Sequence, residues 1–249
     1  MGLDHSSIVV YNLNGGETMS SNHQRLRSKT TQIHRRLLEA YGEPSWRPHL
    51  DAVSELVSTI LSQNTNDVNR DVAFERLRDR LPTWEEVRDA ETEVVIEAIR
   101  PAGLANQKGP RIQEALRFIT EEQGELSLNF LADLPVEDAK RWLTSMNGVG
   151  PKTAAIVLLF ALGRPSFPVD THVHRVTKRL GLIGPRVSRE KAHDELEQLV
   201  AEEDYYAFHL NLIRHGRQIC VSRKPKCDIC LLRDLCEYAQ EQERQSNAT

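Results

Sequence analysis

The sequence predicts an all-α fold, and three observations support this prediction. Glu, Leu, Arg and Ala recur throughout the 249 residues, and these residue types favour helices over strands. Apolar residues recur at spacings of three and four, as in Leu50, Val53, Leu56, Val57 and Ile60, which is the period of one helix face. No stretch of useful length alternates between apolar and polar residues, as a half-buried strand would. We therefore expect many helices joined by short turns.

The expected helices follow a polar, Gly- and Ser-rich segment of 22 residues, which we interpret as a disordered tail. Pro151 suits the first turn of its helix, where no backbone N–H is needed, and Gly163 closes that helix. Asp170 follows Pro168 and is placed to cap the next helix, which ends at Gly181. The expected helices cover residues 23–41, 50–62, 68–81, 84–99, 108–123, 136–145, 151–162, 171–180, 188–199, 205–217 and 231–242.

The composition excludes an integral membrane protein. Apolar residues make up 39% of the chain and charged residues 27%, as in a globular protein. The longest unbroken apolar run, residues 154–162, has nine residues, whereas a membrane-spanning helix needs roughly 20. The N-terminal segment carries no export signal. We expect a cytoplasmic protein, associated with the nucleoid if bacterial, whose cysteines are kept reduced.

Basic residues gather in two segments although the net charge is −4, from 32 basic and 36 acidic residues. Residues 214–226 contain five basic residues and no acid, and residues 164–186 contain five against the single acid Asp170. Each cluster by itself fits a solvated surface of mixed charge. Because both clusters flank other chemical signals, they also fit a local face for nucleic acid.

Four cysteines, Cys220, Cys227, Cys230 and Cys236, lie within 17 residues in the pattern C-x6-C-x2-C-x5-C. Disulfides are not expected in a reducing compartment. Four thiolates could hold zinc, but zinc sites usually show two close C-x2-C-type pairs and here there is one. An iron–sulfur cluster accommodates compact spacings of this kind. The spacing alone leaves zinc and iron–sulfur level.

A glycine turn, Gly148-Val149-Gly150, joins two of the expected helices. Glycines allow a tight hairpin with positive φ, and backbone amides at such a turn and at a helix N-terminus can cradle a phosphate. A simple turn is the alternative interpretation. Lys152 follows in the first helical turn, where the macrodipole and burial would favour the neutral amine, a nucleophile able to form a Schiff base. An exposed lysine that binds phosphate is the alternative.

Asp170 lies 18 residues after Lys152, at the expected cap. A carboxylate beside a helix N-terminus stays ionised, so it could also serve as a base or stabilise a cation. Capping and chemistry can coexist at this residue.

These motifs together resemble the endonuclease III family of helix-hairpin-helix DNA glycosylases, which act in base-excision repair. The resemblance rests on residues 143–155, on Val169-Asp170-Thr171-His172, on His215-Gly216-Arg217 and on the cysteine pattern, and it covers roughly residues 50–238. It implies that Lys152 attacks C1′ of the damaged nucleotide with the assistance of Asp170. It also implies a 4Fe–4S cluster held by Cys220, Cys227, Cys230 and Cys236.

The resemblance further implies how the chain would contact DNA. The hairpin would grip backbone phosphate, a leucine after a glycine would enter the duplex as a wedge, and a polar loop would fill the gap left by the extruded base. The family typically has glutamine as the gap-filling residue, whereas this chain has asparagine there with a glutamine one place earlier. The implied DNA contacts are Gln63, Asn64, Leu104, Gly148, Gly150, Arg223, Lys224 and Lys226. In the loop that holds Gln63 and Asn64, Asn66 or Asp67 would cap the next helix, and we assign the cap to Asp67.

The implied function is a bifunctional glycosylase and abasic-site lyase that removes oxidised pyrimidines from double-stranded DNA. The implied architecture has a six-helix barrel over residues 47–163 and an iron–sulfur domain over residues 23–46 plus 164–249, with the active-site cleft between them. We expect a monomer whose partner is duplex DNA carrying a damaged pyrimidine or an abasic site. The alternatives are a non-catalytic DNA-structure binding protein, a glycosylase of different base preference (for adenine mismatches or 8-oxoguanine) and an electron-transfer iron–sulfur protein.

Overall fold

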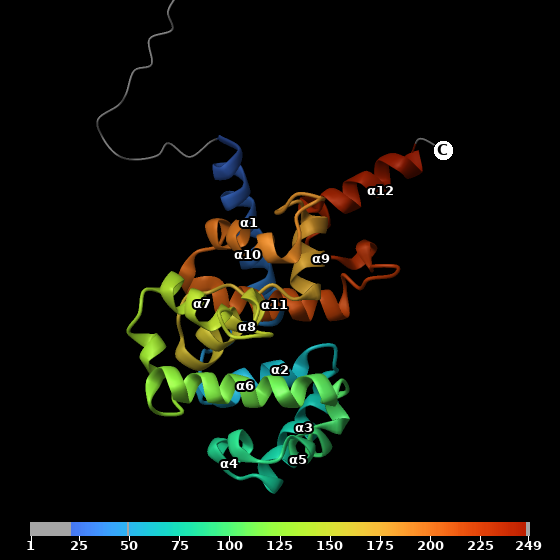
Figure 1. The fold of residues 1–249 in the computed structure, drawn as a ribbon. Coiled ribbons are helices and arrows are strands. Elements are labelled where there is room, and N and C mark those ends of the chain that lie inside the picture. Colours follow the sequence, from blue (N-terminus) through green and yellow to red (C-terminus); the bar gives the residue numbers. More distant parts are fainter. Residues whose placement is uncertain (1–20, 49, 248–249) are drawn as a thin grey trace, which may run out of the picture.

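The computed structural model describes residues 21–48 and 50–247, and within these ranges the chain forms helices and no strand (Figure 1). The prediction of an all-α fold is therefore confirmed. None of the helices in the described part of the chain is long and apolar enough to cross a membrane. Residues 1–20 of the predicted tail lie outside the described residues, and the first helix begins at Ser21, within that prediction.

The helices follow one another with short connections. The α-helices are α1 (Ser21–Tyr41), α2 (Ala52–Ser62), α3 (Asp67–Arg80), α4 (Trp84–Asp89), α5 (Thr92–Ala98), α6 (Ala105–Gln123), α7 (Val136–Thr144), α8 (Pro151–Ile156), α9 (Thr171–Leu180), α10 (Arg189–Leu199), α11 (Tyr205–Gln218) and α12 (Glu237–Asn247). A π-helical turn, η3 (Val157–Ala161), continues α8. Short 3-10 turns are η1 (Arg100–Ala102), η2 (Asn129–Ala132), η4 (Glu202–Asp204), η5 (Cys227–Ile229) and η6 (Arg233–Leu235).

Short polar side chains begin several helices by accepting hydrogen bonds from amides that have no partner within the helix. The side-chain caps are Asp51, Asn66, Thr83, Asp170 and Ser188, at the starts of α2, α3, α4, α9 and α10. The predicted cap of α9 is therefore in place. The assignment of the α3 cap to Asp67 is wrong, because Asn66 accepts from the Asn69 amide and Asp67 is the first helical residue.

The predicted helix over residues 84–99 is divided into α4 and α5. Ala90 lies between them in an extended conformation, with φ −64° and ψ 157°. The Gln113 side-chain amide of α6 donates to the carbonyls of Val87 (3.0 Å) and Ala90 (2.8 Å). The break is stabilised by this long-range contact, because it satisfies carbonyls that a continuous helix would have used.

Three further predicted helices differ in their start or in their type. Helix α6 begins three residues before the predicted start, directly after Leu104, whose backbone is left-handed. The last helix, predicted over residues 231–242, begins only at Glu237, because residues 230–236 form the turn that places the last two cysteines. The second half of the predicted helix over residues 151–162 is π-helical rather than α-helical.

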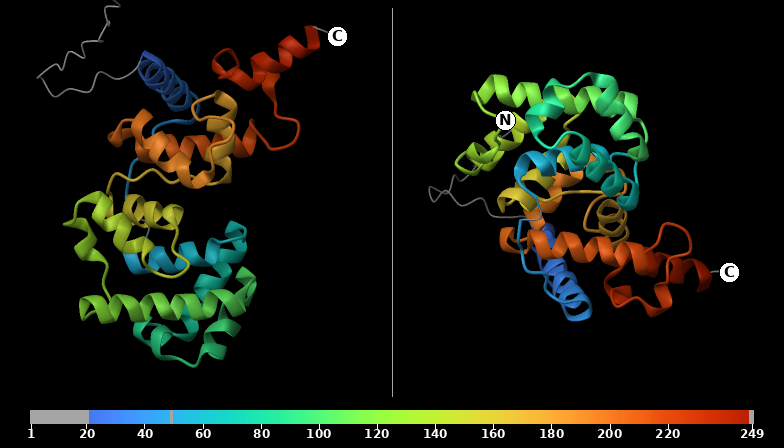
Figure 2. Two further views of the ribbon diagram at one scale, coloured as in Figure 1. Left: turned by 45° about the horizontal axis from the view of Figure 1, so that its top comes forward. Right: turned by 90° about the horizontal axis from the view of Figure 1, so that it is seen from below.

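Two apolar cores hold the described residues together. One core is built from α2 to α8 and includes Leu56, Leu77 and Ile112, which are fully buried. The other is built from α1 and the chain after Leu158, and it includes the fully buried Phe208. Each fully buried side chain of this size contributes about 1.5–3 kcal/mol. The two groups of helices lie one above the other in Figures 1 and 2, and we propose them as the two domains expected from the sequence.

Polar contacts connect the two cores. The Lys140 ammonium of α7 lies 2.6 Å from the Glu197 carboxylate of α10, and Glu197 also accepts from the Phe167 amide at 2.8 Å. The Arg164 guanidinium, in the segment between the cores, donates to the carbonyls of Ala132 and Leu134. These groups are largely buried and paired, so they orient one helical group against the other.

Candidate active site and cysteine cluster

A groove of about 760 Å³ lies between the two helical groups and is lined by residues of both. Lys152 comes from α8 in the first group, and Asp170 comes from the start of α9 in the second. The volume falls within the range of about 300–1,000 Å³ that is common for ligand sites. The two residues that the sequence singled out for chemistry therefore share one accessible site.

The glycine hairpin that leads into Lys152 has two unlike glycines. Gly148 has φ +79°, and a Cβ there would lie 3.0 Å from Cδ of Arg111, so a side chain would be strained. Gly150 is the N-cap residue of α8 and has φ −96° and ψ 178°. Apart from Gly150 itself, its two chain neighbours and the nearby backbone of α8, no described atom lies within 4 Å of the point where its Cβ would stand. The prediction of positive φ is right for Gly148 and wrong for Gly150, whose lack of a side chain is not required by this fold.

Lys152 is half-buried in the second position of α8. Burial lowers the pKa of its amine from the ordinary value, and the cation of Arg189 acts in the same direction. The carboxylates of Asp170 and Asp67 oppose this shift and raise the pKa. The balance leaves more neutral amine than an exposed lysine would have, which is the form that can act as a nucleophile.

Asp170 is held by its role as a cap. Its carboxylate accepts from the Val173 amide at 2.7 Å, so the side chain has a defined position at the start of α9. Another groove residue is His209 of α11, whose Nδ1 is 2.9 Å from the Pro168 carbonyl. Burial lowers the pKa of His209 to about 4, against the opposing effect of Asp170, so its imidazole is neutral at pH 7 and donates through Nδ1. Nothing in the sequence had singled out His209.

One face of α2 supplies a polar wall to the groove. Glu55, Ser58, Thr59 and Ser62 recur at helical spacing along this face, whereas the opposite face packs in the first core. Burial raises the pKa of the Glu55 carboxyl, the charge of Asp51 adds to the effect, and Arg70 and the hydroxyl of Thr59 oppose it. In the sequence, this wall is marked only by Glu55, a charged residue within the apolar repeat of α2.

The predicted gap-filling loop lines the same groove. The Gln63 side-chain amide donates to the Gly148 carbonyl at 3.1 Å, and Asn64 has a left-handed backbone with φ +54°. Leu104 is left-handed too, with φ +51°, and 49% of it is exposed. Leu104 therefore belongs to neither apolar core. An ion pair of 2.9 Å between Asp67 and Arg217 joins α3 to α11 across the groove.

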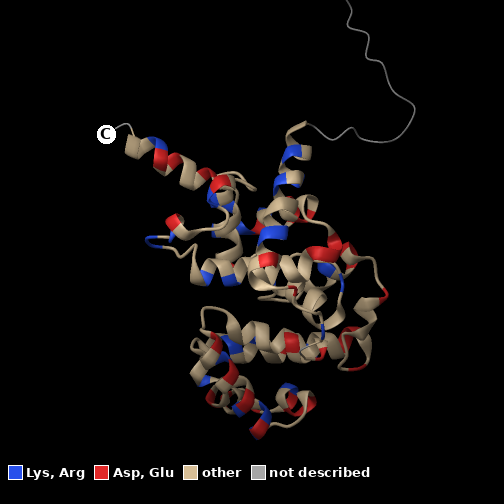
Figure 3. Cartoon of the chain, turned by 180° about the vertical axis from the view of Figure 1, so that it is seen from behind, with Lys and Arg blue, Asp and Glu red and all other residues tan. Residues whose placement is uncertain are grey.

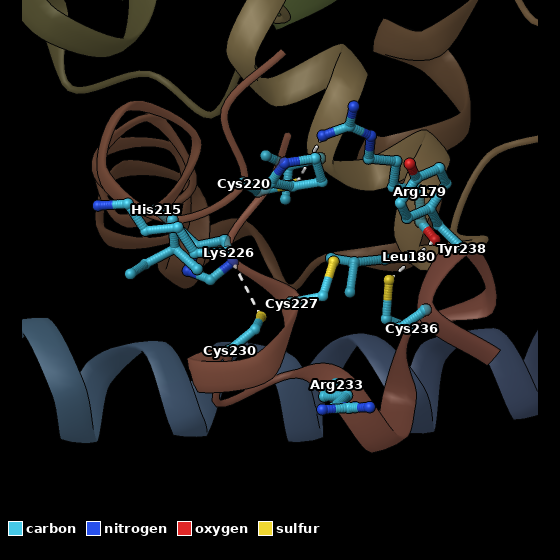
Figure 4. A pocket seen from close by; sticks show the side chains of 14 residues that line it. Arg179, Leu180, His215, Cys220, Lys226, Cys227, Cys230, Arg233, Cys236 and Tyr238 are labelled. Atoms are coloured by element: carbon cyan, nitrogen blue, oxygen red, sulfur yellow. Dashed lines mark hydrogen bonds between the residues drawn. The ribbon is translucent and has the colours of Figure 1, made fainter. Parts of the chain in front are cut away.

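The four cysteines lie apart from the groove. They line one small cavity formed by α9, the end of α11 and the chain that comes after α11 (Figure 4). The Cys220 thiol lies 3.4 Å from the Arg179 guanidinium, and the Cys230 thiol lies 3.5 Å from Nε2 of His215. Burial raises the pKa of Cys230 to about 11, and the neighbouring thiols add to the effect. A cationic cluster would reverse that shift, so this donor set fits a metal centre.

The thiols surround that space rather than meeting at a point. Among the described residues, no group of three His, Cys, Asp or Glu side chains is placed to hold a single metal ion. Thiolates spread around a space suit a cluster of several iron and sulfide atoms, which four cysteines commonly hold. The arrangement therefore fits the 4Fe–4S cluster that the resemblance implied.

A basic loop projects from the body between the first two cysteines and is blue at its tip in Figure 3. Arg223, Lys224 and Lys226 are exposed there, and Lys224 is left-handed with φ +52°. The Arg179 guanidinium holds the base of the loop by donating to the carbonyls of Val221 (2.8 Å) and Ser222 (2.9 Å). Arg179 thus contacts both the loop and a cysteine, a role that the sequence did not reveal.

Known protein families match two parts of the chain. Residues 57–202 match the HhH-GPD superfamily base excision DNA repair protein, and residues 220–236 match the iron–sulfur binding domain of endonuclease III. The second match decides between the two metals that the cysteine spacing left level, in favour of iron–sulfur. The endonuclease III of Sulfolobus acidocaldarius is 36% identical over 185 residues, which cover 74% of this chain and 80% of that protein.

Solved structures share the fold. A non-covalent endonuclease III–DNA complex superposes with a TM-score of 0.74 at 25% identity, covering 88% of this chain and 98% of that chain. A trapped endonuclease III–DNA covalent intermediate, an estranged-adenine complex, superposes with a TM-score of 0.71 at 26% identity, covering 89% of this chain and 99% of that chain.

Proposed function

This chain belongs to the HhH-GPD superfamily of base excision DNA repair proteins and to its endonuclease III family, and we propose that it is a bifunctional enzyme for oxidised pyrimidines. It is a DNA glycosylase of base-excision repair with a 4Fe–4S cluster. The proposal adds that it removes oxidised or ring-saturated pyrimidines from duplex DNA and then cuts the strand at the abasic site. The observation that carries it is a lysine of lowered pKa in one groove with a carboxylate.

Lys152 acts as the nucleophile in this proposal. The lone pair of its neutral Nζ forms a bond to C1′, while the bond from C1′ to the base breaks and the base leaves with that electron pair and takes up a proton. One proton then passes from Nζ to the ring oxygen O4′ as the C1′–O4′ bond breaks, and the opened sugar is left as a positively charged Schiff base. This charge acidifies the C2′ proton, whose loss to solvent expels the 3′ phosphate, and water finally releases the lysine. The structural similarity to a trapped covalent intermediate of endonuclease III with DNA supports a covalent step.

Asp170 serves the same step from the other side of the groove. Its carboxylate is fixed at the start of α9 by the hydrogen bond that it accepts from the Val173 amide. It either accepts the proton that Lys152 must lose before attack or, as a carboxylate, stabilises the positive charge that develops on the sugar. Because Lys152 and Asp170 belong to different cores, the reaction depends on how the two helical groups dock.

The remaining predicted residues are assigned to DNA binding. A base inside a duplex must be extruded before the lysine can reach its sugar, and this unstacking costs a few kcal/mol. Leu104 enters the duplex as a wedge, Gln63 and Asn64 fill the gap, and the amides at Gly148 and Gly150 hold backbone phosphate. Arg223, Lys224 and Lys226 contact phosphates at a distance from the chemistry. We infer a monomer that acts on double-stranded DNA in the cytoplasm.

The 4Fe–4S cluster would supply a rigid frame for the basic loop, and the proposed reaction requires no redox step from it. Cys220, Cys227, Cys230 and Cys236 would hold it. Arg179 would then transmit the position of the cysteines to the loop, since it bonds to both.

Borohydride trapping tests this function. Purified protein is mixed with duplexes that carry an abasic site, thymine glycol, 8-oxoguanine or uracil, alongside Lys152→Ala and, as a matched control, Lys191→Met at an exposed lysine of α10. We expect a covalent adduct on thymine glycol and abasic DNA with the wild type and the control, and none with Lys152→Ala. An adduct on 8-oxoguanine alone would reassign the base preference. Tight binding without any adduct would leave a non-catalytic DNA-binding protein.

A further inference from the structure

A buried lysine, Lys108 in the first turn of α6, lies beneath the two loops assigned to enter the duplex. Only 1% of it is exposed, and the same helix contributes Ile112 and Leu116 to the first core. Its Nζ donates to the Leu61 carbonyl (2.7 Å), the Thr65 hydroxyl (2.8 Å) and the Ala102 carbonyl (2.9 Å). An ammonium has three donors, and here all three are used.

These three acceptors belong to two separate segments. Leu61 and Thr65 lie in the last turn of α2 and in the gap-filling loop, which we define as residues 62–66. Ala102 ends η1, two residues before Leu104, in the wedge turn that we define as residues 102–104. The Thr65 hydroxyl also donates to the Ala102 carbonyl, and the Lys108 amide donates to the Leu104 carbonyl at 3.0 Å. One side chain therefore joins both loops.

Both loops also contain a strained backbone. Asn64 and Leu104 have positive φ values of +54° and +51°. Such conformations persist in residues other than glycine only where the surrounding structure enforces them, and leucine is among the residue types that rarely adopt them. The residues that accept hydrogen bonds from Lys108 lie within three positions of Asn64 or of Leu104. These hydrogen bonds are therefore among the contacts that hold the two residues at positive φ.

Stability alone does not explain a lysine here. Moving an ammonium out of water is unfavourable, and burial lowers the pKa of Lys108 to about 8, although it remains mainly charged at pH 7. An apolar side chain of similar length could fill the space with no such penalty, as replacements of buried charges in other proteins illustrate. What an apolar residue could not do is hold two carbonyls and a hydroxyl from two loops in one position.

We propose that Lys108 is a positioning residue that holds the gap-filling loop and the wedge turn as one rigid unit, so that the wedge and the gap-filling residues enter the duplex together. This inference rests on the proposed function, because it takes the roles of Asn64 and Leu104 from there. It assigns no contact between Lys108 and DNA. The consequence is that Lys108 matters for extruding a base from a duplex but not for the Schiff-base chemistry at Lys152.

The test compares two substrates that differ in whether extrusion is needed. One is a duplex with thymine glycol, and the other is a single-stranded oligonucleotide with an abasic site. Single-turnover rates are measured for wild type, Lys108→Met, Thr65→Val, Leu104→Ala and the exposed-lysine control Lys191→Met. A third readout is the fluorescence of 2-aminopurine placed beside the lesion, which reports unstacking on binding and requires no catalysis.

We expect Lys108→Met to slow base removal from the duplex about ten- to hundredfold, since small misplacements of positioned groups have effects of this size. Cleavage of the single-stranded abasic site should change by no more than about twofold, and the 2-aminopurine signal should fall as it does in Leu104→Ala. Combining Lys108→Met with Leu104→Ala should slow the duplex reaction less than the product of the two separate effects, because both act on one unit. Lys191→Met should match the wild type.

Equal slowing on both substrates would overturn the inference, because it would mean that Lys108 supports the groove as a whole. An unchanged duplex reaction would overturn it as well. If Lys108→Met does not fold, Thr65→Val removes one bond of the same network, and the same contrast is expected at about two- to tenfold. A wild type that unstacks 2-aminopurine but leaves both substrates uncut would refute the proposed function, while the fluorescence of the variants would still decide the role of Lys108.

Discussion

Replacing Gly150 by alanine should weaken DNA binding while leaving the fold almost equally stable. The backbone of Gly150, with φ −96° and ψ 178°, is open to any residue, and no more distant part of the described chain lies within 4 Å of the added Cβ. Loss of glycine's freedom in the unfolded chain stabilises by about 0.4–1 kcal/mol. Alanine is a poorer helix cap than glycine by a similar amount. The two effects oppose each other, so the net change should be within about 0.5 kcal/mol.

Gly148→Ala is the matched comparison two residues away. Its φ of +79° disfavours a side chain by about 1–2 kcal/mol, and Arg111 must also move. For a chain of this length each kcal/mol corresponds to about 2–4 °C in Tm, so Gly148→Ala should melt roughly 2–8 °C lower and Gly150→Ala within about 2 °C of the wild type. Thermal denaturation followed by circular dichroism measures this difference.

DNA affinity then separates structure from function at Gly150. A Cβ between the hairpin amides and a phosphate would remove a charge-assisted hydrogen bond worth about 1.5–3 kcal/mol, or roughly ten- to hundredfold in Kd on abasic duplex DNA. An unchanged Kd for Gly150→Ala would show that DNA does not approach this residue. A fall in Tm as large as that of Gly148→Ala would show that the fold itself requires glycine there. Either result refutes the reasoning.

Asp170→Asn keeps a capping side chain but removes the charge that raises the pKa of Lys152. The acid limb of the pH profile of the trapping rate should therefore move to lower pH, and the maximal rate should fall at least about tenfold. A shift of this limb to higher pH would contradict the role assigned to Asp170. His209 is protonated near pH 6.5 in the unfolded chain but only near pH 4 in the folded chain. The free energy of unfolding should therefore fall as the pH drops through this window, by roughly 3 kcal/mol at its lower end. In urea melts at several pH values, His209→Gln should flatten this dependence of the unfolding free energy on pH. Cys230→Ser should abolish the visible absorption of the cluster and reduce DNA affinity; retention of both would remove Cys230 from the ligand set. Lys226→Ala should make the fall of log affinity with log salt concentration less steep by about 1, because one phosphate contact is lost. Trapping at Lys152 on saturating DNA should persist. An unchanged slope would place the basic loop away from phosphate.

Local chemistry explains why much of the fold could be predicted. The bounds of α9 agree with the predicted helix because Asp170 at one end and Gly181 at the other end act within one turn of the chain. Helix α4 begins where a Thr83–Glu86 capping box requires, yet the prediction carried it through residue 99. Its end depends on Gln113, which is distant in sequence and comes close only after folding.

The candidate site also contains some residues that local sequence reveals and others that only the folded chain reveals. Lys152 and the cysteines were recognisable because first-turn placement and short spacings are local properties that a motif preserves. His209 and Lys108 were not, since a histidine or lysine within a helix carries no signal of burial. Their lowered pKa values arise from surroundings that several distant segments contribute.

The sequence by itself determined the all-helical fold, the Asp170 cap of α9, the family and the four-cysteine pattern, because periodicity, capping and motif spacing act over a few residues. Only the tertiary structure decided that Lys152 and Asp170 face one groove, that Gly150 is free of structural need and that Lys108 joins two loops. The physical reason is that burial, desolvation and long-range hydrogen bonds depend on which segments pack together, and these quantities do not exist until the two cores have formed and docked.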